Sequence, residues 1–477
     1  MVRTARAILL PSLLIIAGSC ALAFGQDAGL PPGQVIEKIT CHANPAESYA
    51  LYLPSNYTPA RKWPILYAFD PMARGMVPVE KFKDLAEKYG YILVASNNSR
   101  NGPWSVSVRA AQAMWQDTHV RFWLAPRRSY ATGFSGGARV ACALGRMAPG
   151  EVAGVIGMGA GFPLGTGQGP SADLPFIYYG TVGIRDFNYP ELMQLDKTLT
   201  DLNIVHRVEV YDAGHDWPPP EVFAAVIEWM ELHAMKAGSR EKDETRVTEW
   251  FIHRLEEARE LRAAGNLAEA FKRFQWLSAD FESLHDIAEV KAEISQLEGS
   301  KELKKALKRE NQRQERIQAM VDAAYGEFNQ ALGPLQEHGG DLWQIREALH
   351  GLRLPNRLKL AKEQQDKDEG IAAERFVRAV LVHAYEEAVE ALARKDYAKA
   401  RLNWMIASEC APESGQIHYM LARAHALNKA NKDALAELRT AIEKGFTNRE
   451  ELEKNPDFDG LQQTPEFAKL LDQIKKP

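Results

Sequence analysis

The chain is poor in cysteine and has no excess of positive charge. Only four of its 477 residues are cysteines, so a small scaffold held together by disulfides is excluded. Lysine and arginine number 58 against 63 aspartate and glutamate, which gives a formal net charge of −5. The overall basic surface with which most nucleic-acid-binding proteins hold phosphate is therefore missing. Hydrophobic residues make up 45%, which is typical of folded globular proteins.

Long apolar runs are absent after the first two dozen residues. At the start, Arg3 and Arg6 precede a short apolar run and then small residues, a pattern that predicts a signal peptide over 1–23. The run is too short for a membrane-spanning helix and contains Pro11. Cys20 lies in a context that resembles a lipoprotein signal only loosely, so no lipid anchor is expected. We predict export to the periplasm or the exterior, with no transmembrane segment after cleavage.

Three cysteines remain in the mature chain, at positions 41, 142 and 410. An odd number of thiols can close at most one disulfide, and the wide spacing gives neither a metal-ligand cluster nor a redox pair. Cys41, Cys142 and Cys410 are therefore expected to be buried structural thiols.

The second half of the chain has few prolines and no strand-like runs, unlike the first. Residues 1–240 hold 41 of the 121 charged residues and 19 of the 25 prolines. In this part, short β-rich runs alternate with helical patterns, which predicts a mostly parallel sheet with helices on both faces over 40–237. The expected strands are 49–53, 65–69, 91–96, 129–134, 152–158, 176–179 and 207–211, and the clearest helices are 79–89, 110–122 and 222–235.

The second half has helical periodicity throughout and is predicted to be all α. A charged segment at 238–248 is the expected linker, followed by a helical region over 249–375 and by repeats with terminal helices over 376–477. A shift of 34 residues moves Ala388, Ala400, Trp404 and Ala407 onto Ala422, Ala434, Leu438 and Ala441. This period and these small residues resemble tetratricopeptide repeats, so the domain is predicted to be TPR-like. An isolated copy is expected over 250–282, on Ala258, Gly265, Ala270 and Phe274.

The segment 133–137 reads Gly-Phe-Ser-Gly-Gly and fits the pattern G-x-S-x-G. In this pattern the glycines let the chain turn sharply from a strand into a helix and expose the serine hydroxyl. The pattern alone is weak evidence, but a predicted strand precedes it and a helical stretch over 138–147 follows it. Ser135 is therefore the candidate nucleophile.

A serine hydroxyl needs a base, and the base needs an acid that orients it. His215 follows the strand at 207–211, in a loop at the strand's carboxyl end, and is the candidate base. His206 is its main competitor but begins the same strand. Asp186, which follows the strand at 176–179, is the candidate acid. The other aspartates considered precede a strand, lie in a helical stretch or adjoin the histidine: Asp173, Asp196, Asp201 and Asp216.

With these motifs in order, residues 45–235 resemble the α/β-hydrolase superfamily, in particular serine esterases of the polyhydroxybutyrate-depolymerase, feruloyl-esterase and dienelactone-hydrolase kind. The resemblance implies an α/β hydrolase fold followed by the all-α, TPR-like domain. It also implies an oxyanion hole made by two backbone amides, which map to Gly136 and to the turn after the strand at 65–69. Pro71 in that turn has no N–H, so Met72 is the expected second donor.

Residues for substrate binding are expected in the loops beside the nucleophile. Asn98, Arg100 and Trp104 follow a predicted strand, and Trp217 follows the candidate base. The two tryptophans could equally pack the loops onto the body of the domain. The mechanism that the resemblance implies needs no metal ion and no organic cofactor.

The sequence thus predicts an exported serine hydrolase, most simply a carboxylic-ester hydrolase, that acts on a small-molecule or polymer ester. The TPR-like region is expected to bind a protein or peptide or to control access to the site. Nucleic acid is not expected as a partner. One alternative is a catalytically idle hydrolase-like scaffold that carries a protein-binding module. Another is a peptidase of the prolyl-oligopeptidase-like class, although that family's propeller domain is absent from this sequence.

Overall fold

The N-terminal half of the chain is built on one eight-stranded sheet. The computed structural model describes residues 29–163 and 169–474, so the predicted signal peptide at 1–23 lies outside the described residues. The strand order is β1-β2-β4-β3-β5-β6-β7-β8. Pairs β1–β2 and β2–β4 are antiparallel, and all other pairs are parallel. The predicted mostly parallel sheet is confirmed. Its strands are β1 (Val35–Thr40), β2 (Ser48–Tyr52), β3 (Trp63–Phe69), β4 (Ile92–Ser96), β5 (Leu124–Phe134), β6 (Val152–Met158), β7 (Ile177–Gly183) and β8 (His206–Tyr211).

Helices cover both faces of this sheet, because its strands are apolar on both sides. In β3, Ile65 and Tyr67 belong to one hydrophobic cluster while Leu66 and Ala68 belong to another. The first cluster includes side chains from α2 (Trp104–Arg121), α3 (Gly136–Met147) and α4 (Tyr189–Asp201). The second includes side chains from α1 (Met76–Tyr89) and α5 (Pro220–Lys236). We call residues 29–237 the sheet half.

The sheet half begins earlier than the predicted boundary at residue 40. Strand β1, which the sequence analysis did not expect, pairs with β2 along the edge of the sheet. It contains Glu37 and Lys38, both exposed, and so lacks the apolar run that marks the other strands. Charged residues are common on edge strands, where they oppose pairing with other chains.

The linker is shorter than the predicted 238–248. Helix α6 (Glu244–Ala263) begins inside that range, and the Asp243 side chain caps it by accepting a hydrogen bond from the Arg246 amide. Val247 is fully buried in a cluster with Leu232 and Met235 of α5. The helical half, residues 244–474, therefore packs directly against the sheet half.

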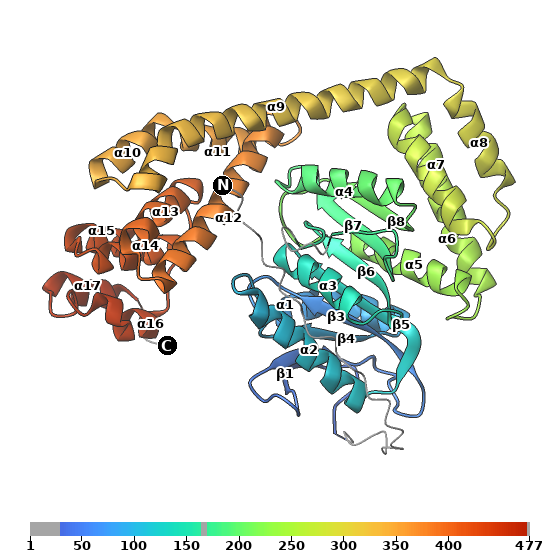
Figure 1. Cartoon of the computed structure of the whole chain (residues 1–477), viewed down its shortest axis with the longest axis horizontal. Coiled ribbons are helices and arrows are strands. Elements are labelled where there is room, and N and C mark those ends of the chain that lie inside the picture. Colours follow the sequence, from blue (N-terminus) through green and yellow to red (C-terminus); the bar gives the residue numbers. More distant parts are fainter. Residues whose placement is uncertain (1–28, 164–168, 475–477) are drawn as a thin grey trace, which may run out of the picture.

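The helical half is all α in the described residues, as predicted. Figure 1 shows the long helix α9 running from the group α6–α8, which lies beside α5 and β8, to the C-terminal group α10–α17. Helix α12 lies on the side of the C-terminal group that faces the sheet half. The remaining helices are α7 (Leu267–Phe281), α8 (Ala288–Glu298), α9 (Lys301–His338), α10 (Leu342–Gly351), α11 (Leu354–Glu363), α12 (Asp368–Ala393), α13 (Tyr397–Cys410), α14 (Gly415–Leu427), α15 (Asn431–Glu443), α16 (Arg449–Lys454) and α17 (Pro465–Gln473).

The small residues of the predicted repeat lie where neighbouring helices touch. All eight repeat positions are 0% exposed: Ala388, Ala400, Trp404, Ala407, Ala422, Ala434, Leu438 and Ala441. They belong to α12–α15, which pack as the successive pairs α12 with α13 and α14 with α15. The isolated copy at 250–282 corresponds to α6 and α7, where Ala258, Ala270 and Phe274 are also fully buried. Burial at helix contacts thus accounts for the recurrence of small residues every 34 positions. The TPR-like assignment itself stays a prediction.

None of the helices in the described residues is both long and apolar enough to cross a membrane. Cys41, Cys142 and Cys410 are buried free thiols. Burial raises the pKa of the Cys41 thiol to about 12, so this group stays protonated and unreactive at neutral pH.

Candidate active site

Ser135 lies at a sharp turn between β5 and α3. Its backbone has φ 52° and ψ −121°, a strained conformation for a residue with a side chain. The turn depends on close backbone approach. A Cβ atom on Gly133 would lie 2.3 Å from the Gly137 carbonyl group, and one on Gly137 would lie 2.0 Å from the Phe69 carbonyl oxygen. These two glycines allow the strand and helix to meet, and the predicted strand-turn-helix is present.

The structure brings the three predicted polar residues into one hydrogen-bonded chain. Ser135 Oγ is 3.0 Å from His215 Nε2, and His215 Nδ1 is 2.9 Å from each carboxylate oxygen of Asp186. The His215 and Asp186 side chains are 7% and 1% exposed. The rings of Phe134 and Phe187 lie 4.6 and 4.3 Å from the imidazole, centroid to centroid, and restrict its orientation.

The Asp186 carboxylate is held by its own loop. Oδ1 accepts a hydrogen bond from the Asn188 amide at 2.8 Å, and the Asp186 amide donates to the Gly183 carbonyl oxygen. Asn188 in turn donates through Nδ2 to the Gly159 carbonyl oxygen. These bonds fix the carboxylate beside the imidazole and supply part of the hydrogen bonding that a buried charge requires.

The competing residues lie elsewhere or have other partners. His206 Nε2 is 3.3 Å from Asp196 Oδ1, and its Nδ1 is 2.7 Å from the Ile204 carbonyl oxygen, at the start of β8. The Asp216 carboxylate accepts a hydrogen bond from the Trp217 amide. Neither of these carboxylates is bonded to His215 in the structure.

One predicted oxyanion donor is available, and the other already has a partner. Gly136 is the first residue of α3, where helix geometry provides no acceptor for the amide and the helix dipole favours negative charge. The Met72 amide instead donates to Asp70 Oδ1 at 2.8 Å. Met72 can therefore serve an oxyanion only by sharing this hydrogen with Asp70, and its role as the second donor stays a prediction.

Two of the four residues expected to bind substrate have structural contacts instead. Asn98 Oδ1 accepts from the Ser48 amide, and its Nδ2 donates to the Ala46 carbonyl oxygen, so this side chain holds the start of β2. Trp217 is only 5% exposed and packs against Phe134 in the core. These contacts give both side chains a structural role, and the expected role of Asn98 and Trp217 in substrate binding stays a prediction.

The other two expected residues remain on the surface of the loop before α2. Arg100 is exposed, and its backbone pairs with Met72 in an isolated bridge. Trp104 begins α2 and is 36% exposed. Both are therefore accessible to a ligand near this loop.

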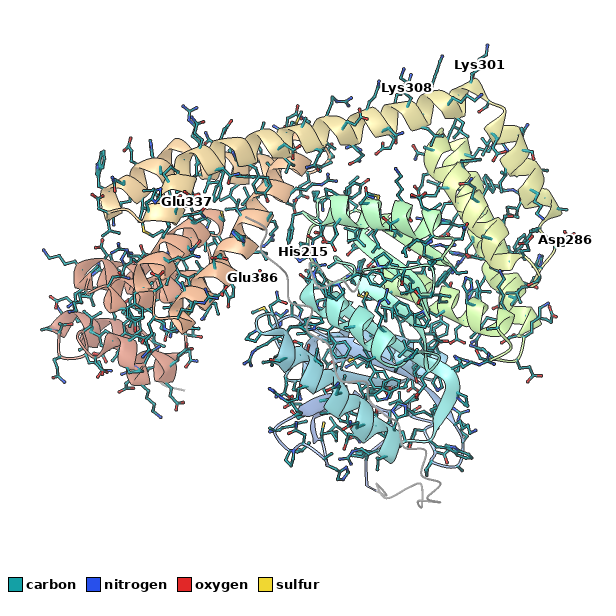
Figure 2. The ribbon with its side chains drawn as sticks, viewed as in Figure 1. His215, Asp286, Lys301, Lys308, Glu337 and Glu386 are labelled. Atoms are coloured by element: carbon teal, nitrogen blue, oxygen red, sulfur yellow. The ribbon has the colours of Figure 1, made fainter. Side chains whose placement is uncertain are left out.

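Sequence reasoning missed Asn101, the residue nearest Gly136 from this loop. A Cβ atom on Gly136 would lie 1.8 Å from Asn101 Oδ1, so the carboxamide lies directly over the glycine. Asn101 Nδ2 donates to Glu386 Oε1 on α12 at 2.6 Å. Figure 2 labels Glu386 on the part of α12 that faces the sheet half. Asn101 was detectable as a neighbour of Arg100, whereas no local pattern marks Glu386.

Helix α12 makes two further contacts that the sequence did not reveal. Arg375 donates from Nε and Nη2 to the Ile184 carbonyl oxygen, two residues before Asp186. Glu374 Oε2 is 3.0 Å from Arg185 Nε. The site therefore includes side chains from both halves of the chain.

The described residues contain no group of three or more histidine, cysteine, aspartate or glutamate side chains arranged to hold a metal ion. The chemistry that the arrangement offers is that of a hydroxyl nucleophile with a base, an orienting carboxylate and a backbone donor for negative charge.

No protein-family model and no curated protein matches this chain. Solved structures similar to it include a ferulic acid esterase, 15% identical, which covers 41% of this chain and 94% of its own with a TM-score of 0.33. Another is the S-formylglutathione hydrolase of Staphylococcus aureus, 13% identical, with coverages of 42% and 99% and a TM-score of 0.34.

A third similar structure is the dipeptidyl peptidase 4 of Porphyromonas gingivalis, 14% identical, which covers 41% of this chain and 34% of its own with a TM-score of 0.32. These neighbours are esterases and other serine hydrolases, and each is similar to less than half of the chain. At these identities and TM-scores the likeness does not distinguish one activity from another. The evidence for a particular chemistry is therefore the geometry of the site itself.

Proposed function

We propose that this chain is an exported serine hydrolase that cleaves carboxylic esters through an acyl-enzyme on Ser135. One observation carries the proposal: Ser135 Oγ, the His215 imidazole and the Asp186 carboxylate form a continuous hydrogen-bonded chain on a strained turn. Strain at a turn persists only where the surrounding structure enforces it, and such strain is concentrated at functional sites. The export part of the proposal rests on the signal-like sequence at 1–23.

In the first step Ser135 Oγ attacks the carbonyl carbon of the ester while its proton moves to His215 Nε2. The Asp186 carboxylate holds the imidazole in the tautomer with a proton on Nδ1 and stabilises the imidazolium that forms. The Gly136 amide, at the positive end of α3, stabilises the oxyanion. When the tetrahedral intermediate collapses, the bond to the alcohol oxygen breaks and His215 returns the proton to that oxygen.

In the second step a water molecule takes the place of the alcohol. His215 Nε2 removes a proton from the water as the water oxygen attacks the acyl carbon, and the Gly136 amide again stabilises the oxyanion. The bond to Ser135 Oγ then breaks, Oγ recovers a proton from His215, and the carboxylic acid leaves. The residues present suffice for each transfer, since every proton moves between Oγ, Nε2 and the reacting oxygens.

We further propose that the helical half controls access to Ser135. The support is the hydrogen bond between Glu386 of α12 and Asn101, whose carboxamide lies over Gly136. A substrate that reaches Gly136 from this side meets α12. The TPR-like region over 376–477 is the part proposed to bind a protein or peptide partner, because repeat arrays present concave binding surfaces.

The test is pre-steady-state hydrolysis of p-nitrophenyl esters of increasing chain length by the full mature protein, with S135A as the control. We expect a burst of p-nitrophenol equal to the enzyme concentration, absent in S135A. Peptide p-nitroanilides provide the peptidase arm, and their preferential turnover would replace the ester assignment. Absence of turnover in a demonstrably folded protein would favour the alternative of a catalytically idle scaffold. The next experiment would then be capture of a binding partner by the full chain.

A further inference from the structure

The loop that carries Asp186 is bonded to the loop that carries His215. The Ile184 amide donates to the Tyr211 carbonyl oxygen at 2.8 Å, and the Arg185 amide donates to the Ala213 carbonyl oxygen at 2.9 Å. A displacement of residues 184–186 therefore moves the acid and also disturbs the segment that leads to the base. A contact that holds Ile184 in place therefore helps to hold both Asp186 and the segment that leads to His215.

Arg375 of α12 holds this loop on both sides of Asp186. Its Nε and Nη2 atoms lie 3.0 and 2.6 Å from the Ile184 carbonyl oxygen. Its guanidinium also lies 4.2 Å from the centre of the Tyr189 ring, and the Tyr189 amide donates to the Asp186 carbonyl oxygen. The contacts that Arg375 makes with Ile184 and Tyr189 thus bracket the four residues from Arg185 to Asn188.

Arg375 is only 2% exposed, and in the described residues it has no ion pair with a carboxylate. Its hydrogen-bond acceptors are neutral, the Ile184 carbonyl oxygen and Gln314 Oε1. Burial lowers the pKa of Arg375 to about 10, so the group stays charged at neutral pH. A buried charge without a carboxylate partner is costly and therefore unusual. Its electrostatic neighbours include Asp186, whose charge favours the protonated guanidinium.

The preceding residue, Glu374, contacts the same two loops. Glu374 pairs with Arg185. It also lies close to Gly214, the residue before His215, because a Cβ atom on Gly214 would lie 2.3 Å from Glu374 Oε1. Arg185 also forms an ion pair with Asp212 at the end of β8. Consecutive residues of α12 therefore engage both the acid loop and the base loop.

We propose that Arg375 is a positioning residue for the Asp186–His215 pair, so that the helical half completes the active site as well as limiting access to it. The proposal rests on the proposed function, because it assigns Arg375 a role in the reaction of Ser135. A residue with this role affects the reaction step and leaves ground-state binding of a small ester unchanged.

The test compares Arg375→Met with Arg254→Met in the full-length mature protein. Arg254 of α6 is also a largely buried guanidinium that bonds to the sheet half, through Glu228 and the Ala225 carbonyl oxygen, but it contacts neither catalytic loop. We expect Arg375→Met to lower kcat for a short ester about tenfold or more with KM within twofold of wild type, and Arg254→Met to leave both unchanged. Arg375→Lys keeps the charge and a single donor nitrogen in place of the two that bond to Ile184, and should recover part of the loss.

A spectroscopic readout separates this proposal from the proposed function. The proton that His215 Nδ1 shares with Asp186 gives a low-field proton NMR resonance, which can be observed whether or not the protein turns over an ester. We expect it to shift or broaden in Arg375→Met and to be retained in Arg254→Met. If Arg375→Met does not fold, Arg375→Lys carries the same comparison. A resonance and kcat that match wild type in a folded Arg375 variant would overturn the proposal, whereas a silent wild-type enzyme would count against the proposed function alone.

Discussion

Helices α3 and α12 both contact the surroundings of Ser135, but they contribute in different ways. Helix α3 comes from the sheet half and contributes backbone: the Gly136 amide at its N-terminus, and Gly137, whose lack of a side chain allows the close approach to Phe69. Helix α12 comes from the helical half and contributes charged side chains, among them Glu374, Arg375 and Glu386. Under the two proposals made above, the sheet half carries the chemistry and the helical half sets its precision and the access of substrate.

The largest expected effect lies in the sheet half, at Asp186. We expect Asp186→Asn to lower kcat about 10⁴-fold, because an asparagine cannot hold the imidazole in the productive tautomer or stabilise its charged form. Steady-state ester hydrolysis measures the loss, and the melting temperature reports whether the fold is kept. A loss below about tenfold in a folded variant would show that Asp186 is not the acid.

Glycine substitutions give a second contrast between the halves. At Gly133 a Cβ atom would collide with the Gly137 carbonyl, so Gly133→Ala should lower the free energy of unfolding by about 3 kcal/mol and abolish most activity. Gly326, in the exposed middle of α9, has open space around it, and Gly326→Ala should raise stability by about 0.5–1 kcal/mol. Urea denaturation of the two variants tests both signs. Equal effects would contradict the role assigned to the turn.

The difference between the sheet half and the helical half also explains how much of the site could be predicted from the sequence. The parallel sheet was predictable because its central strands are marked by apolar runs. Ser135, Asp186 and His215 were predictable because each follows the carboxyl end of such a strand. Strand β1 was missed because its charged residues hide the strand pattern. Arg375 and Glu386 were missed because only the folded chain brings α12 to the catalytic loops, and no spacing within α12 marks them. Met72 was predicted as the second oxyanion donor. Its competing hydrogen bond to the Asp70 carboxylate could not be foreseen, because that bond depends on the geometry of the turn.

The pH dependence of stability should have opposite signs at two histidines, one in each half, beginning with His233 of α5. Burial lowers the pKa of His233 to about 4. Between about pH 6.5, the ordinary value, and pH 4, the unfolded chain binds a proton that the folded chain does not. Stability should therefore fall as the pH falls through this range, and less so in His233→Phe, which keeps the packing on Trp229. Parallel stability curves for wild type and variant would contradict this assignment.

His418 of α14 should show the reverse. Its hydrogen bond to Glu437 raises the pKa of this histidine, so the stabilisation is fully present below the unfolded-state pKa of about 6.5 and is lost as the pH rises through the folded-state value. We expect wild type to lose more stability than His418→Gln between pH 6 and 8. Thermal melts across this range provide the measurement, and a steeper loss in the variant would be inconsistent with the Glu437 contact.

The smallest effect is expected where the two halves meet over Gly136. Removing the bond from Asn101 with Glu386→Ala should raise kcat/KM for bulky esters about fivefold relative to the acetate, the equivalent of one hydrogen bond of about 1 kcal/mol. Glu386→Gln retains an acceptor for Asn101 and is the matched control, expected to behave as wild type. An unchanged ratio in Glu386→Ala would argue that α12 does not limit access.

The central claim is that Ser135 is an activated nucleophile in the full-length protein. Intact-mass analysis and peptide mapping after treatment with a fluorophosphonate test it most directly. The account predicts one adduct per chain, located on Ser135 and absent from a folded S135A variant. A folded wild-type protein that takes up no adduct, or an adduct that persists in S135A, would contradict it.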